Sequence, residues 1–575
     1  MRAALICLIA CGGSEAIAPT KRAVIGEVAR PPTPPPRPCA ATSPDQIGEW
    51  RYALVTEPFD PVEDVTHEQL FEAWSDGSLA AAPDTIAALA PALGDPSRVA
   101  RLMNTGRAEP RTTRRAIVPA HELSPAWKPV TIDGAHPLTG ASPLAVPLCG
   151  VAQAAVRNID PDKLSTVVIS GTTALTRRTA ERIESHSAQD LVRHIAPWFR
   201  SADITHVSNE VAFLRDCDPE AGPSGDPMDL IFCSKDRYIE VLEAIGTDVV
   251  ELTGSHLSDY GSRTLLRTIE MYRKRGWVWF GGGRTQLEAA EPRLIEHHGN
   301  RFAFVGCNAV GTWLHAVSKG AGVAACDWPR MTWEIRDLRR RGLLPIVSVQ
   351  HQETHEHDVP PGLVTDLRRL AEAGAMVVLG SQAHSAHPWD VHHGAYVHYG
   401  PGNILFAQSV EAQREASVDK LYVHAGRLLA VEKLYTRTEH GQPRPLTDRE
   451  RARFLRQMAK VAADLPPADP WIAPIAAETD RVRPDSLIVD HGRVQQVLVR
   501  MPERMTSDRR YPLVVDLMGG FAYPDDAFVV APIGKVRATG PEIAGFIHAK
   551  YPVDPDRTSI SEPAKPTKKR RSRRR

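Results

Sequence analysis

The stretch Asp248-Val-Val-Glu-Leu-Thr-Gly-Ser-His256 decides the fold of this 575-residue chain. It is a short apolar strand pattern that ends in small polar residues and a histidine, and a helical pattern follows over Asp259–Lys274. Strand, polar loop and helix form the repeating unit of parallel α/β sheets, in which chemistry lies on loops past the carboxyl ends of strands. The stretch therefore predicts an α/β fold with a site beside His256.

The same unit repeats on both sides of this stretch and predicts one long α/β domain over residues 160–435. Short apolar runs alternate there with amphipathic helical patterns. The expected strands are Val167–Ser170, Ile204–Val207, Val249–Thr253, Trp277–Phe280, Phe302–Val305, Pro345–Val349 and Met376–Leu379. The expected helices are Asp259–Lys274, Trp333–Arg341 and Pro360–Ala373.

Polar clusters follow the ends of several expected strands. They contain imidazoles and carboxylates, which can hold a divalent metal that polarises an oxygen or activates a water. Eight of the 22 histidines lie between His351 and His398. The clusters are Ser170–Arg177, Val207–Glu210, Leu252–Gly261, and the paired runs Gln350–His355 and Gly380–His384.

Position within these clusters separates candidate ligands from ordinary loop residues. His256 and His384 each follow an apolar strand and have small neighbours, so we expect both to contact a ligand. Glu210 fits a metal or substrate contact and a loop cap equally well. Thr172, Thr173 and Arg177 can bind an anion at the start of the next helix or simply cap it. Three other histidines are expected to be solvated or hydrogen-bonding loop residues: His392, His393 and His398.

In order and spacing, these motifs resemble those of the bacterial CapA family of extracytoplasmic capsule and poly-γ-glutamate proteins. The Asp248–His256 stretch, with Asp259 and Gly261, looks like the family segment that carries Asn-His followed by Asp-x-Gly. Three more segments look like family motifs: Ala202–Glu210, Gly374–His384 and His398–Asn403. Together the resemblance covers residues 160–435.

The resemblance implies a four-layer α/β/β/α metallophosphoesterase-like sandwich and a role in making or exporting an anionic envelope polymer. It also implies a divalent metal (Mn, Fe or Zn), with Glu210, His256 and His384 as its ligands. His256 would be catalytic, with Asp259 or His351 assisting as acid or base. The expected substrate-binding residues are Asn209, Arg177 and Asn403.

Departures from the family pattern weaken the expected metal centre. Gly171-Thr172 stands where the family has Gly-Asp, Ser255 replaces an Asn, and Gln382 replaces a His. A further family His aligns with either Gln350 or His351, which point to opposite faces of a strand. A two-metal site needs a bridging carboxylate and several imidazoles, so we expect one weaker site at most. Two interpretations stay open: a metal-dependent hydrolase of the phosphoesterase kind, and a non-catalytic polymer-binding or assembly factor.

The N-terminus predicts export. Arg2 supplies a positive charge, and the short apolar run Ala3–Ala10 ends at Cys11 in a lipobox-like pattern. We expect residues 1–10 to be a signal peptide and Cys11 to carry a lipid that anchors the protein outside the cytoplasm, in the cell envelope. The alternative is a wrongly assigned start. Residues 11–46 are Pro-rich and predict a stiff linker.

Cysteine usage agrees with export. Six cysteines remain when Cys7 and Cys11 are set aside, and an even number fits disulfides in an oxidising compartment. The pairs Cys217–Cys233 and Cys307–Cys326 are favoured because each closes a short loop inside the central domain. The alternative is six buried free thiols.

The flanking segments differ in character. Residues 47–150 alternate strands and helices as a small α/β module, with either a ligand-binding or a packing role. Residues 436–474 predict a charged helix, Thr447–Ala463, and a Pro-rich linker. In the small module the expected strands are Trp50–Val55, Arg115–Val118 and Val130–Asp133, and the expected helices are Thr66–Trp74 and Pro83–Ala90.

The C-terminal segment resembles the opening strands of an α/β-hydrolase esterase over residues 475–562. The Gly-x-Ser-x-Gly motif that should follow is absent, so we expect an inactive, truncated segment. Residues 563–575 form a basic tail that is expected to be disordered. Because the formal net charge is 0 and the tail holds much of the positive charge, no basic surface for nucleic acid is indicated.

Overall fold

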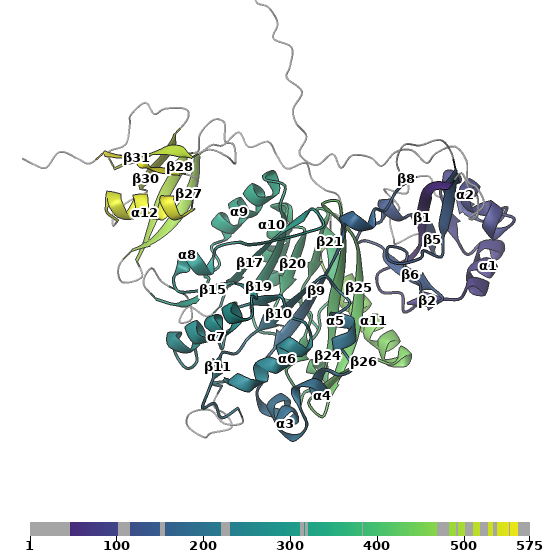
Figure 1. Cartoon of the computed structure of the whole chain (residues 1–575), viewed down its shortest axis with the longest axis horizontal. Helices are drawn as coiled ribbons and strands as arrows, with labels where there is room; N and C mark the ends of the chain where they lie inside the picture. Colours follow the sequence, from purple (N-terminus) through teal and green to yellow (C-terminus); the bar gives the residue numbers. More distant parts are fainter. Residues whose placement is uncertain are drawn as a thin grey trace, which may run out of the picture.

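The computed structural model describes residues 46–101, 115–149, 156–219, 230–310, 316, 320–381, 383–468, 482–489, 493–500, 510–517, 527–532, 538–550 and 553–561. The expected signal peptide, Cys11, nearly all of the Pro-rich linker, Gln382 and the basic tail lie outside these residues. Figure 1 shows a large central unit with a smaller unit on each side.

Two β-sheets form the centre of the large unit (Figure 1). The first has the order β14 (Val278–Phe280), β13 (Val249–Glu251), β10 (Ile204–Asn209), β9 (Leu164–Thr173), β24 (Glu415–His424), β25 (Arg427–Glu439) and β26 (Gln442–Pro445), and β23 (Asn403–Leu405) also pairs with β9. The second has the order β16 (Arg293–His297), β17 (Asn300–Asn308), β19 (Leu344–Gln350), β20 (Val377–Gly380), β22 (Ala395–His398) and β21 (Trp389–His392).

Helices cover the outer face of each sheet and complete four layers. Three hydrophobic clusters define the layers: one between the first sheet and its helices, one between the two sheets, and one between the second sheet and its helices. The first sheet carries α3 (Arg177–Ser185), α4 (Ala188–Val192), α5 (Ala196–Phe199), α6 (Ile239–Ala244) and α7 (Ser262–Lys274). The second carries α9 (Trp328–Arg340) and α10 (Pro361–Glu372), and the result is the expected α/β/β/α sandwich.

Each strand and helix predicted for this domain is present, and its bounds follow local chemistry. All ten residues of β9 are buried, as expected for a strand that is covered on both faces. Helix α7 begins at Ser262 rather than at Asp259 because Gly261 has a φ of 83° and because Asp259 accepts hydrogen bonds from outside the helix. The parallel neighbours β9, β10 and β13 bring the polar clusters to one edge.

Both favoured disulfides are present. Cys217 bonds to Cys233, and Cys307 bonds to Cys326. Cys149 is disulfide-bonded as well. The prediction of six free thiols is therefore wrong for these five cysteines.

The predicted charged helix after the sheets is α11 (Asp448–Ala463). It begins with a capping box between Thr447 and Glu450, which satisfies backbone donors at the helix start. Its apolar side adds Phe454, Leu455 and Met458 to the cluster between the two sheets. Helix α11 is therefore packed into the sandwich itself.

In its described residues, the N-terminal unit is an eight-stranded sheet with two α-helices. Its central strand β1 (Gln46–Thr56) pairs with β5 (Ala116–Pro119), β6 (Lys128–Ile132), β7 (Ala145–Cys149) and β8 (Val156–Arg157); the remaining elements are β2 (Asp64–Val65), α1 (His67–Asp76), β3 (Ala80–Ala81), α2 (Pro83–Leu93) and β4 (Ala100–Arg101). Ala53 and Trp127 share a buried cluster with Tyr422 and Leu429 of the large sandwich. These contacts support a packing role for the unit.

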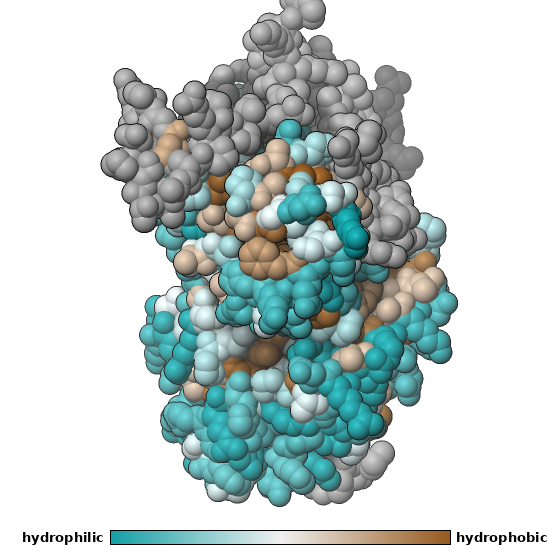
Figure 2. Space-filling view, turned by 90° about the vertical axis from the view of Figure 1, so that its right-hand side faces the viewer, coloured by the Kyte–Doolittle hydropathy of each residue, from teal (hydrophilic) through white to brown (hydrophobic). Residues whose placement is uncertain are grey.

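The C-terminal unit is a five-stranded sheet with the order β27 (Val482–Val489), β28 (Arg493–Arg500), β30 (Phe528–Pro532), β29 (Tyr511–Asp516) and β31 (Val553–Ser561), accompanied by α12 (Gly540–Lys550). The esterase resemblance stays a prediction. Among the described residues, no helix combines the length and apolar character needed to cross a membrane. On the side shown in Figure 2, hydrophobic residues form only small separate patches among the coloured atoms.

Candidate functional site

Glu210 lies at the centre of the strand-end cluster, directly after β10. Its side chain is buried, and Oε1 accepts hydrogen bonds from Ser255 Oγ at 2.9 Å and from Gln350 Nε2 at 3.4 Å. A Cβ on Gly254 would lie only 2.5 Å from the Cα of Glu210, so a glycine is required for this close approach. Two sheets thus meet at one carboxylate, since Ser255 follows β13 and Gln350 ends β19.

Two imidazoles accompany this carboxylate. His256 Nδ1 lies 2.8 Å from Asp259 Oδ2, and His384 Nδ1 lies 2.9 Å from Asn403 Oδ1. Burial acts to lower the pKa of His256, but its hydrogen bond to Asp259 and the charge of Glu210 raise that pKa above its usual value. With each Nδ1 held by an oxygen, Nε2 is the ring nitrogen that can face a ligand, although Nε2 of His384 also contacts Glu353 at 3.4 Å.

A second carboxylate, Glu353, also contacts the cluster. Its Oε1 lies 3.4 Å from His384 Nε2 and 3.3 Å from His355 Nε2. The hydrogen bond to His384 lowers the pKa of Glu353, whereas in His384 that bond and the charge of Glu210 overcome burial and raise the pKa. Glu353 lies in the predicted strand-end cluster Gln350–His355, but no role was predicted for it. Its position in the loop after Gln350 is the sequence feature that could have indicated a place in the site.

Uncharged side chains occupy the positions where the family carries further ligands. Thr172 Oγ1 donates to the carbonyl of Ser381 at 2.9 Å, and Ser381 Oγ donates to Gln350 Oε1 at 3.0 Å. Gln350 faces Glu210, whereas His351 Nε2 lies 3.1 Å from Asp366 Oδ2 of α10. Adjacent strand residues point to opposite faces, so His351 is turned into the helical layer. Its expected acid–base role does not fit this geometry.

The three expected substrate-binding residues have different surroundings. Asn209 Nδ2 donates to Tyr272 OH at 2.9 Å and to the Val211 carbonyl at 2.7 Å, so its amide belongs to the packing between β10 and α7. Asn403 orients His384, as described above, and is a positioning residue. Asn209 thus does not fit its expected role, and Arg177 is the remaining candidate.

Arg177 and His256 both contact the ring of Phe232. Its guanidinium carbon is 4.5 Å from the ring centroid of Phe232, and that ring lies 4.5 Å from the His256 ring. Burial lowers the pKa of Arg177, and among the described residues no carboxylate forms an ion pair with it. The Cys217–Cys233 disulfide fixes the residue next to Phe232. A guanidinium held against an aromatic ring is suited to bind a carboxylate or phosphate.

The donor set suits a divalent metal in type but not in spacing. One carboxylate and two imidazoles are ligands that Mn, Fe and Zn accept, and each imidazole is oriented by an oxygen, as metal-binding histidines usually are. However, among the described residues only Glu372, His392 and His393 bring three such ligand atoms within 4.8 Å of one another. Glu210, His256 and His384 must therefore draw together to hold an ion.

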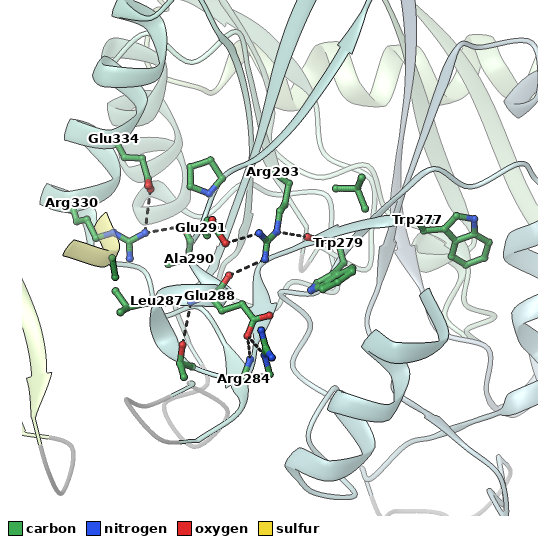
Figure 3. Close-up of a pocket in the computed structure, with 14 residues that line it drawn as sticks. Trp277, Trp279, Arg284, Leu287, Glu288, Ala290, Glu291, Arg293, Arg330 and Glu334 are labelled. Carbon is green, nitrogen blue, oxygen red and sulfur yellow. Dashed lines mark hydrogen bonds and ion pairs between the residues drawn. The ribbon is translucent and has the colours of Figure 1, made fainter. Parts of the chain in front are cut away.

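A groove of about 980 Å³ lies elsewhere, between β14, β16, α9 and the short helix α8 (Gln286–Ala289), and is shown in Figure 3. None of the expected site residues lines it. Its charges pair with one another: Arg284 with Glu288 at 2.8 Å, Arg293 with Glu291 at 2.5 Å and Arg330 with Glu334 at 3.2 Å. These pairs leave the groove without a focused charge, so the strand-end cluster is the better candidate site.

Residues 166–408 match the family model described as bacterial capsule synthesis protein PGA_cap. The capsule biosynthesis protein CapA of Bacillus anthracis is 20% identical over 315 residues, which are 54% of this chain and 76% of that protein. The PGA biosynthesis protein CapA of Bacillus subtilis (strain 168) is 20% identical over 267 residues, 46% of this chain and 68% of that protein.

Solved structures give a weaker likeness. A 5'-nucleotidase precursor from Thermus thermophilus has a TM-score of 0.28 and 12% identity, and covers 52% of this chain and 58% of its own. The Haemophilus influenzae NAD nucleotidase has a TM-score of 0.30 and 9% identity, with 52% and 59% coverage. It is the sequence match, together with the motifs at the strand ends, that decides the family: the central domain of this chain belongs to the CapA family of bacterial capsule synthesis proteins.

Proposed function

We propose that the protein acts outside the cytoplasm in the production of an anionic polymer of the capsule or poly-γ-glutamate type. In this proposal the strand-end cluster binds the polymer and one divalent ion. The observation that carries it is the position of Glu210 beside His256 and His384, with the guanidinium of Arg177 on the ring of Phe232, which also contacts His256. An anionic chain would meet the divalent ion and the guanidinium of Arg177 in this part of the molecule.

The proposed location rests on covalent chemistry. Two disulfides in the central domain favour an oxidising compartment, in which such bonds persist. The lipobox-like pattern before Cys11 supports attachment to the membrane through a lipid, facing the periplasm or the cell exterior. Both features are consistent with work on a polymer that is assembled at the cell envelope.

Each residue of the site has a separate task in this proposal. Glu210 and the Nε2 atoms of His256 and His384 would hold the ion, which supplies polarisation of a polymer oxygen or activation of a water. Asp259 and Asn403 keep the imidazoles oriented. Arg177 would pair with a carboxylate or phosphate of the polymer.

A non-catalytic polymer-binding role is the second candidate. The wide spacing of the three ligands favours it, and so do the uncharged side chains of Ser255 and Gln350, which bond to Glu210. The two candidates differ in metal content. Only the metal-dependent role needs a bound ion that is lost when Glu210 is changed.

Glu210→Gln is expected to remove one Mn, Fe or Zn equivalent from the purified full-length chain. The change keeps the shape and a hydrogen-bonding oxygen but removes the negative charge that offsets the ion. Elemental analysis of untagged protein measures the loss, and Glu270→Gln on the exposed face of α7 is the control that should retain the metal. An ion content equal in both variants would reject the metal-dependent role and leave the binding role.

Arg177→Gln is expected to weaken binding of poly-γ-glutamate about 10–100-fold, the usual range for losing a charge-assisted hydrogen bond of about 1.5–3 kcal/mol. Fluorescence anisotropy of labelled polymer at low and physiological salt measures it. Arg237→Gln is a matched control, since Arg237 also lies over an aromatic ring, Tyr238, but is already paired with Glu184. Equal affinity in the two variants would exclude Arg177 from the binding site.

A further inference from the structure

A second group of potential metal ligands lies outside the strand-end cluster. Glu372 is the last residue of α10, His392 is the last residue of β21, and His393 lies in the turn that leads to β22. His392 Nε2 is 3.1 Å from Glu372 Oε1. The ligand atoms of all three residues lie within 4.8 Å of one another.

The turn explains how two consecutive histidines come to share one side. Successive strand residues normally point to opposite faces. Here His393 has a φ of 50° and Gly394 a φ of 74°, the left-handed pair that a two-residue hairpin turn requires, and His392 pairs with Ala395 across the hairpin. The turn brings the two rings to 4.6 Å between centroids.

This group is separate from the strand-end cluster. Strand β22 runs parallel to β20, with Val377 opposite Tyr396 and Leu379 opposite His398. The hairpin turn before Ala395 therefore lies at the amino ends of these strands, whereas His384 follows their carboxyl ends. The length of the second sheet separates the two groups, so an ion at one does not share ligands with the other.

We propose that Glu372, His392 and His393 form a divalent metal site whose preferred ion is zinc. Two imidazoles and one carboxylate are a common protein donor set for zinc, and a water can complete the tetrahedron. Zinc–nitrogen bonds of about 2.0–2.1 Å set neighbouring ligands about 3.4 Å apart, close to the 3.1 Å between His392 and Glu372. The negative end of the α10 dipole also favours a cation beside Glu372.

The ion would tie the hairpin at the edge of the second sheet to helix α10. Strand β21 is the edge strand and pairs only with β22 among the described residues. A bond from His392 and His393 through the ion to Glu372 would hold this edge against the helix that covers it. The expected consequence is a structural site that adds thermal stability.

The chain contains its own comparison for this site. His297, His298 and Gly299 repeat the same turn, with φ values of 47° and 74° at His298 and Gly299 and ring centroids 4.0 Å apart. There, however, His298 Nδ1 bonds to the Leu164 carbonyl at 2.7 Å, and among the described residues no compact three-ligand group forms. Asp203 Oδ2 lies 3.9 Å from His297 Nδ1 there, so what distinguishes the first turn is the compact grouping of Glu372 with both imidazoles.

The test is zinc binding by the untagged full-length chain in equilibrium dialysis. His393→Asn is expected to lose about one zinc equivalent, because Asn tolerates the left-handed turn but removes the imidazole. His298→Asn makes the same change in the comparison turn and should keep that zinc. In a Glu210→Gln background, where the strand-end cluster should hold no ion, His393→Asn should still remove one zinc equivalent, so the outcome is independent of that cluster.

A second variant and a second measurement keep the test decisive. Glu372→Gln leaves the backbone of the turn untouched and should also lose the zinc, together with the rise in melting temperature that zinc gives the wild type. If His393→Asn and Glu372→Gln both bind zinc like the wild type, the proposal is overturned. If one unfolds, the other, checked by circular dichroism, decides the matter.

Discussion

Replacing Asp419 by Asn is expected to destabilise the sandwich by about 3–5 kcal/mol, the usual cost of removing one partner from a buried ion pair. Asp419 is fully buried in β24 and forms an ion pair with Lys433 of β25. It also accepts hydrogen bonds from His398 Nδ1 at 2.7 Å and from Tyr396 OH at 3.1 Å. Without the carboxylate, the ammonium of Lys433 stays buried with no opposite charge against it.

The same residue gives the domain an acid-sensitive component. Burial acts to raise the pKa of Asp419, but the charges of His398 and Lys433 lower it from 3.8 to about 2. Because the folded pKa lies below the unfolded one, the unfolded chain takes up the proton first as the pH falls. This stabilisation is complete above about pH 4 and is lost towards about pH 2. Asp419→Asn should lack this part of the acid dependence.

Scanning calorimetry at pH 7 and urea unfolding between pH 2 and pH 7 measure both effects. Asp448→Asn is the control, since the Asp448 side chain is 93% exposed and its ion pair with Arg451 is on the surface. That change should alter the free energy of unfolding by less than about 0.5 kcal/mol. A similarly small change for Asp419→Asn would show that Lys433 finds another partner or loses its proton.

Asp419 also shows why part of the fold escaped prediction. No strand was predicted over β24 or β25, because charged residues interrupt their apolar runs. The register explains those charges: Asp419 lies opposite Lys433 and Lys420 opposite Glu432, so opposite charges meet across the hairpin. The hydrophobic pattern of one segment does not show which strand it will pair with, so these charge pairs could not be predicted. His398 was likewise expected to lie in a loop, but it is buried in β22 beside Asp419.

The sequence predicts which residues of the candidate site come together at the strand ends. It does not predict which face of a strand each side chain points to. Glu210, His256 and His384 come together because the carboxyl ends of parallel strands meet. The choice between Gln350 and His351 depended on the direction of the side chains in β19, which the sequence left open. Asn209 was expected to bind substrate from the family resemblance, but it precedes Glu210 in the chain, and neighbours in a strand face opposite ways.

His256→Ala is expected to have the largest effect on function, with polymer formation in the native host falling to the level of a strain that lacks the protein. In the proposed function His256 holds the ion, and losing it removes the group that would polarise a polymer oxygen or activate a water. Polymer per cell is the measurement, with protein abundance checked by immunoblot. His194→Ala, a change in an exposed residue outside the site, is the control.

Asp259 offers a way to separate positioning from direct participation. Its carboxylate contacts the Nδ1 of His256, so Asp259→Asn should reduce polymer formation about 10–100-fold, as is typical for residues that orient a ligand histidine. Because Asp259 acts through His256, Asp259→Asn should lower the metal content together with polymer formation. A loss of polymer formation with unchanged metal content would mean that Asp259 has an independent role. If His256→Ala leaves polymer formation unchanged while Arg177→Gln reduces it, the cluster binds the polymer without turning it over, because Arg177 supplies charge but no route for a proton.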